Sequence, residues 1–152
     1  MRRAMALRSV LVLFPCALVA GVDFAVNASV RTPAADFHPR STAWSAGALV
    51  VLLVLFPCGL LPSRLASLAA GVAAGGVAGN LVSAALHGGR VPNPLTAGAV
   101  AFNAADLAIV GGAPFLVVAL ARVAIRNRSF VDRHVPPRRW ERGLRRRLGL
   151  DD

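Results

Sequence analysis

The sequence contains no lysine, only two cysteines and only seven acidic residues in 152. Cys16 and Cys58 lack a CxxC spacing and no cluster of metal-ligand residues accompanies them, so neither a metal site nor a cofactor site is predicted. Each cysteine follows a proline in the repeated string VLFPC. That context favours a packing role next to a kinked helix.

Apolar residues are abundant instead, at 56% of the chain, and the mean hydropathy is +0.61. A soluble domain of this size rarely reaches that value. Apolar stretches cover residues 10–30, 43–61, 65–86 and 95–121. Each approaches the roughly 20 residues that a helix needs to cross a hydrocarbon layer about 30 Å thick. The sequence therefore predicts an all-α integral membrane protein with four transmembrane helices.

The 17 basic residues are all arginines, and their distribution predicts an orientation. Fourteen lie at the N-terminus, in the short link that contains Arg64 and from Arg122 onward; three, Arg31, Arg40 and Arg90, lie in the other two connections. The positive-inside rule then places both termini in the cytoplasm, and the chain is expected to be a multi-pass protein of the cell's inner (plasma) membrane. Arginines beside apolar spans are more typical of contact with anionic lipids than with nucleic acid, so membrane lipids are expected partners and nucleic acid is not.

The chain is predicted to divide into a four-helix transmembrane domain, residues 1–126, and an Arg-rich cytoplasmic tail, residues 127–152. Trp140, Leu144 and Leu148 are spaced four apart in the tail. This spacing fits a short helix on the membrane surface, and a disordered basic tail is the alternative.

The N-terminus has a second interpretation. Arg2 and Arg3 precede an apolar run that ends in VNA before Ser29, as in a secretory signal peptide. Cleavage there would leave three spans and no explanation for the charge of the tail. We therefore interpret the run as the first of four spans.

Polar residues inside the apolar stretches are few and fall toward one predicted side of the membrane. Asp23 lies near the outer end of the first stretch, Asn80 and Ser83 near that of the third, and Asn103 and Asp106 in the outer half of the fourth. Because lipid penalises such groups, they usually face a cavity or a partner. In an antiparallel bundle they are expected to form one site.

Two strings resemble motifs of the lipoprotein signal peptidases, also called signal peptidase II. GGVAGNL at residues 75–81 is similar to the start of the family pattern GGxxGNxxDR, and its glycines also suit close helix packing. FNAADLAIVGG at residues 102–112 matches FNxADxxIxxG at every fixed position. Asp23 resembles the acid of the family's first box, DQxxK, whose other residues are absent. The resemblance implies an intramembrane aspartic endopeptidase that removes signal peptides from lipidated prolipoproteins.

The resemblance also assigns the site residues. Asp106 corresponds to one catalytic aspartate, and Asn93 occupies the position of the other, in the loop that resembles GxVxDF. Asn80, Asn103 and Asp23 are then expected to bind substrate. The mechanism needs two carboxyls that share one proton, and an amide cannot replace either of them.

Three functions remain open at this point. The first is a peptidase homologue that cleaves lipidated prolipoproteins, with Asp23 as the one carboxyl available to pair with Asp106. The second is a catalytically silent relative that binds a lipoprotein, a lipid or a membrane partner. The third is a structural membrane subunit in which Asp106 forms hydrogen bonds between helices. The expected partner in the first case is the signal peptide of a lipidated prolipoprotein, and the chain is expected to be a monomer.

Overall fold

The computed structural model describes residues 2–134 and residue 147, and it is mostly helical. The four long helices are α1 (Arg2–Ser29), α2 (Thr42–Gly59), α3 (Arg64–Leu86) and α4 (Ala104–His134). The short elements are the 3-10 helix η1 (Ala34–Asp36) and the strands β1 (Phe37–Pro39), β2 (Arg90–Pro92), β3 (Leu95–Ala97) and β4 (Val100–Phe102). The predicted surface helix around Trp140 and Leu144 lies outside the described residues.

Each of the four apolar stretches overlaps a helix that is long and apolar enough to cross a membrane: Arg3–Ser29, Thr42–Gly59, Arg64–Leu86 and Ala104–Asn127. The chain divides into two compact units, Met1–Leu120 and Ala121–Asp152, and α4 runs from the first into the second. The packing described below belongs to the first unit.

The fourth helix begins later than predicted. The apolar stretch was expected to be helical from Leu95, but residues 95–102 form the antiparallel pair β3–β4 and α4 begins at Ala104. Gly98 lies between the two strands with φ +62°, a backbone conformation that glycine adopts easily. Pro94 disfavours helical backbone at the residue before it. The prediction of an all-α chain was therefore wrong for these connections.

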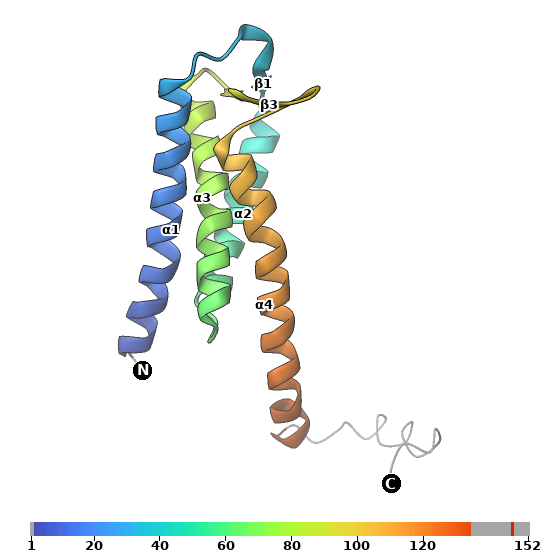
Figure 1. Cartoon of the computed structure of the whole chain (residues 1–152). Helices are drawn as coiled ribbons and strands as arrows, with labels where there is room; N and C mark the ends of the chain where they lie inside the picture. Colours follow the sequence, from blue (N-terminus) through green and yellow to red (C-terminus); the bar gives the residue numbers. More distant parts are fainter. Residues whose placement is uncertain (1, 135–146, 148–152) are drawn as a thin grey trace. The chain divides into compact units, whose positions relative to one another are not determined.

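A second pair of strands joins the two connections that were predicted to lie outside the membrane. β1 pairs antiparallel with β2, with Phe37 opposite Pro92 and Pro39 opposite Arg90. The Arg40 N–H extends this pairing with a bond of 2.7 Å to the Gly89 carbonyl. Both pairs of strands lie at the end of the bundle where α1 ends and α4 begins (Figure 1).

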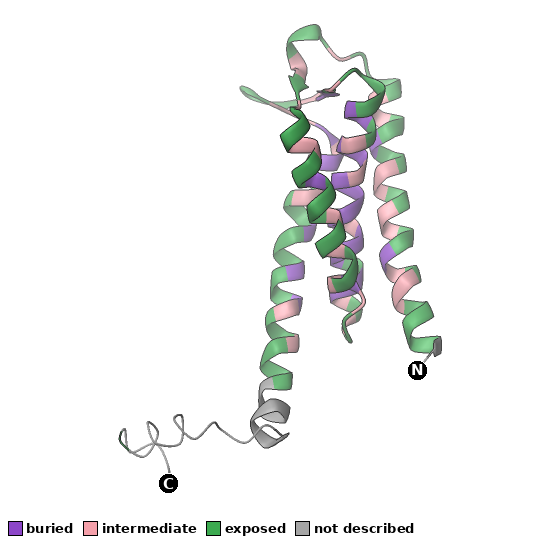
Figure 2. Ribbon diagram, turned by 180° about the vertical axis from the view of Figure 1, so that it is seen from behind, coloured by how far each residue is buried: buried purple, intermediate pink, exposed green. Residues whose placement is uncertain are grey.

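Helix α3 is the centre of the packing. Two thirds of its apolar span is buried, against 17% or less for each of the other three helices. In Figure 2 the buried positions are concentrated along this helix. The faces of the other helices that point away from α3 are apolar and exposed, as expected of helices that contact lipid rather than water.

The glycines of α3 allow its neighbours to approach to backbone distance, as their spacing predicted. A Cβ built on Gly71 would meet the carbonyl oxygen of Val12 in α1, and one on Gly75 would lie 2.7 Å from the Cys16 carbonyl oxygen. On the other face, a Cβ on Gly76 would meet the carbonyl oxygen of Ala105 in α4. Glycines on two faces of α3 thus allow close contact with α1 on one side and with the first turn of α4 on the other.

This packing predicts the effect of one methyl group. Gly76→Ala should lower the free energy of unfolding in detergent by about 1–2 kcal/mol, because the backbone of α4 has to move away. Gly47→Ala in α2 is the matched control, since its Cβ would meet nothing within 4 Å. Denaturant titration of both variants checks this, and equal stability of the two would contradict the close contact.

Candidate functional site

Asn103 and Asp106 close the start of α4 with two reciprocal hydrogen bonds. The Asn103 Oδ1 accepts the Asp106 backbone N–H at 2.8 Å, and the Asp106 Oδ2 accepts the Asn103 N–H at 3.4 Å. This is the geometry of a capping box, in which the residue before the helix and the third helical residue satisfy each other's backbone donors. The order N-x-x-D within FNAAD therefore has a local structural role.

Asn80 of α3 links this cap to the centre of the bundle. Its Nδ2 donates to the Asp106 Oδ1 at 2.9 Å, and its Oδ1 accepts from the Asn103 Nδ2 at 2.7 Å. The Asn103 Nδ2 also donates to the Pro92 carbonyl in β2 at 3.3 Å. These hydrogen bonds bring the three predicted site residues together. Asn80 and Asn103 are fully buried, whereas the Asp106 side chain is partly exposed.

Asp23 reaches the same helix end from α1. Its Oδ1 accepts the Ala105 backbone N–H at 2.9 Å, and its Oδ2 lies 3.0 Å from the Asn27 Nδ2 and 3.5 Å from the Ser83 Oγ. The side chain is completely buried. A carboxylate there satisfies one of the free N–H groups at a helix N-terminus and opposes the positive end of the helix dipole.

Asn27 is the member of this cluster that the sequence analysis missed. Its Nδ2 donates to Asp23 and also to the Ser83 Oγ, at 3.2 Å. The available signal was its position four residues after Asp23, which places both side chains on one face of α1.

Asn93 lies beside this cluster and makes no hydrogen bond to it. Its Nδ2 donates to the Ala101 carbonyl at 3.1 Å, its backbone N–H donates to the Asp36 carbonyl at 3.1 Å, and its buried Oδ1 has no hydrogen-bond partner. The side chain therefore holds the β3–β4 hairpin against the segment before it.

The oxygens of both carboxyl groups, Asp106 and Asp23, already have hydrogen-bond partners, whereas the buried Asn27 Oδ1 has none among the described residues. Both oxygens of Asp106 accept hydrogen bonds from amides, and both oxygens of Asp23 accept from amide or hydroxyl donors. Within residues 3–127, no carboxyl group is hydrogen-bonded to Asp106. The two acids accept the backbone N–H groups of Asn103 and Ala105 at the start of α4, and no hydrogen bond joins the two carboxyl groups in this part of the chain. In the same part of the chain no group of three metal-ligand side chains is present.

Comparisons of this chain with known protein families, curated proteins and solved structures found no match.

Proposed function

We propose that this chain is a multi-pass membrane protein of the lipoprotein signal peptidase type that binds lipidated prolipoproteins without cleaving them. Both termini would face the cytoplasm, and the polar cluster would lie near the outer surface of a plasma membrane. The observation that carries the proposal is the pairing of Asp106 with the amides of Asn80 and Asn103, with an asparagine, Asn93, at the position of the second family aspartate.

The chemistry of peptide cleavage supports a protein that binds its ligand without cleaving it. An aspartic peptidase needs one carboxylate to activate water and one carboxylic acid to polarise the peptide carbonyl. Asn93 can do neither, and its amide group donates to Ala101. A peptidase that uses Asp23 and Asp106 is the second candidate, favoured by the attachment of both acids to the first turn of α4.

An apolar groove supports the binding part of the proposal. It has a volume of about 380 Å³ and is lined entirely by apolar side chains and glycines of α3 and α4: Leu65, Leu68, Ala69, Val72, Gly111, Gly112 and Phe115. Gly111 lies on α4 one to two helical turns beyond Asp106. The groove has the apolar lining that an acyl chain or an apolar peptide segment requires.

Binding is tested with a diacylglyceryl-modified signal peptide that carries a fluorophore, added to the purified chain in detergent. We expect saturable binding that Gly111→Leu weakens about tenfold, because a Cβ on Gly111 meets nothing within 4 Å and the leucine would fill the groove. Gly47→Leu, at an equally open glycine of α2, is the control and should bind as the wild type does.

Cleavage is measured in the same samples by mass spectrometry, with an active lipoprotein signal peptidase as the positive control. We expect the peptide to remain intact. We also expect the affinity of Asp106→Asn for the peptide to lie within about threefold of that of the wild type, because the amide keeps the shape of the carboxylate and one acceptor oxygen. Cleavage that disappears in Asp106→Asn would establish the peptidase instead. Absence of binding by the wild-type chain would overturn the proposal.

A further inference from the structure

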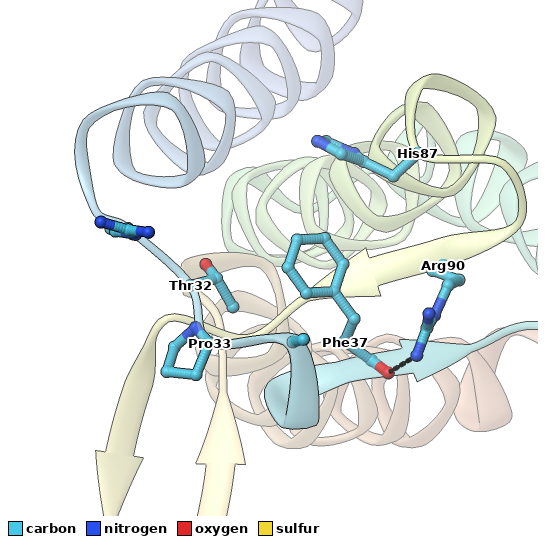
Figure 3. Close-up of a pocket in the computed structure, with 7 residues that line it drawn as sticks. Thr32, Pro33, Phe37, His87 and Arg90 are labelled. Carbon is cyan, nitrogen blue, oxygen red and sulfur yellow. Dashed lines mark hydrogen bonds between the residues drawn. The ribbon is translucent and has the colours of Figure 1, made fainter.

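A second cavity lies in the connections at the β-strand end of the bundle, away from the groove between α3 and α4. Its volume is about 580 Å³, and its lining residues are Arg31, Thr32, Pro33, Ala34, Phe37, His87 and Arg90. They come from three separate places: the segment after α1 with the start of β1, the end of α3, and β2. Figure 3 shows Phe37 at the centre of this group, with His87 and Arg90 on different sides of it.

The charge of the cavity has one sign. Two arginines line it and no acidic residue does. Neither Arg31 nor Arg90 forms an ion pair with any residue in the described part of the chain, and both side chains are exposed. Arg90 uses one of its donors, Nη2, in a bond of 3.3 Å to the Phe37 carbonyl (Figure 3). This bond places the guanidinium at the cavity and uses only one of its five N–H donors.

His87 adds a further polar atom to the wall. Its Nδ1 lies 2.8 Å from the Ser83 carbonyl oxygen, so this nitrogen carries a hydrogen and Nε2 is left for another partner. The ring packs against Phe37, with centroids 5.8 Å apart and planes inclined at 59°. The cavity thus combines cationic donors with an aromatic wall.

These features select the chemistry of a ligand. Planar guanidinium groups bind phosphate oxygens in a two-pronged geometry, and an aromatic and proline wall suits an organic group attached to the phosphate. The cavity also lies where α1 and α3 end, the level at which a membrane protein meets lipid headgroups. We propose that this cavity binds an anionic phosphate ester, held by Arg31 and Arg90 against Phe37. The site is separate from the proposed peptide-binding groove.

Two sources of the phosphate are distinguished by two measurements on the full-length protein. In the first, the protein is reconstituted in phosphatidylcholine nanodiscs that contain a minor fraction of phosphatidylglycerol, and bound lipid is counted by native mass spectrometry. In the second, sn-glycerol 3-phosphate is titrated into the protein in neutral detergent by calorimetry. Retention of phosphatidylglycerol alone assigns the site to a lipid headgroup; binding of the soluble ester assigns it to phosphate esters in solution.

Arg31→Gln and Arg90→Gln should each lower the affinity for the bound ligand about tenfold, because each removes charge-assisted hydrogen bonds to the phosphate. Arg40→Gln is the matched control: it removes the same charge from the same end of the bundle, where the guanidinium lies over the Trp44 ring at 4.8 Å and does not line the cavity. Its affinity should stay within about twofold of the wild type, because only long-range attraction is lost.

The proposal is overturned if neither ligand binds the wild-type chain. It is also overturned if the double variant that carries both Arg31→Gln and Arg90→Gln binds the ligand with the affinity of the wild type. It is also overturned if Arg40→Gln loses as much affinity as the cavity variants, since the attraction would then be unspecific. Thermal unfolding of each variant confirms that a loss of binding is not a loss of folding. Peptide binding in the groove serves as a second check, because the cavity variants should retain it.

Discussion

Replacing Asp23 by alanine is expected to lower the free energy of unfolding in detergent by about 3 kcal/mol, the largest loss for any single side chain considered. The carboxylate is fully buried and is the acceptor for the Ala105 N–H, the Asn27 amide and the Ser83 hydroxyl. Alanine leaves these donors in an apolar interior without their acceptor. The unpaired Ala105 N–H makes the largest contribution to this loss, because a residue at the start of a helix has no carbonyl in the preceding turn that could accept its hydrogen bond.

Asp23→Asn should cost less, about 1 kcal/mol, because the amide oxygen still accepts the Ala105 N–H while the amide nitrogen meets the Asn27 and Ser83 side chains. Asp36→Ala is the control: its backbone carbonyl accepts the Asn93 N–H, but its carboxylate makes no hydrogen bond in the described structure. Chemical denaturation of the three variants checks the order. Wild-type stability of Asp23→Ala would show that the Asp23 carboxylate does not hold α1 against α4.

The sequence was sufficient to predict the four long helices and the clustering of the polar residues at one end of them. Runs of lipid-crossing length predict helices because only a helix satisfies its own backbone groups over such a distance in lipid. Short connections then make neighbouring helices antiparallel, so polar residues near the same ends meet. Asn80, Asn103 and Asp106 were placed together by this reasoning, and hydrogen bonds of 2.7–2.9 Å join Asn80 to the other two.

Two features of the structure could not be predicted from the sequence, for physical reasons. Residues 95–102 are as apolar as the helix that follows, and hydropathy alone does not separate a short hairpin from the first turns of a helix. The partner of Asp23 was also hidden, because its acceptor oxygen binds a backbone N–H 82 residues away, and backbone donors have no signature in a side-chain pattern. The orientation of Asn93 toward Ala101 depends on that same unpredicted hairpin.

The second large effect is expected at Asn103, which binds three groups with one side chain. Its Nδ2 donates to the Asn80 Oδ1 and the Pro92 carbonyl, and its Oδ1 accepts the Asp106 N–H. Asn103→Ala removes the helix cap and leaves two buried acceptors without a donor, which should cost about 2–3 kcal/mol in unfolding free energy. Asn80→Ala should cost about 2 kcal/mol, because it removes one bond to Asn103 and one to Asp106.

The double variant separates a connected network from two independent anchors. Because Asn103 and Asn80 share a bond of 2.7 Å, the loss in the double variant should fall short of the sum of the single losses by about 1 kcal/mol. Asn103→Ala with Ser67→Ala is the control pair: Ser67 is buried near the other end of α3 and its hydroxyl donates to the Gly59 carbonyl of α2, so these losses should add. Additivity in both pairs would mean that Asn80 does not hold the cap of α4. A deficit only in the Asn80 pair would mean that Asn80 and Asn103 act together to hold the start of α4 against α3.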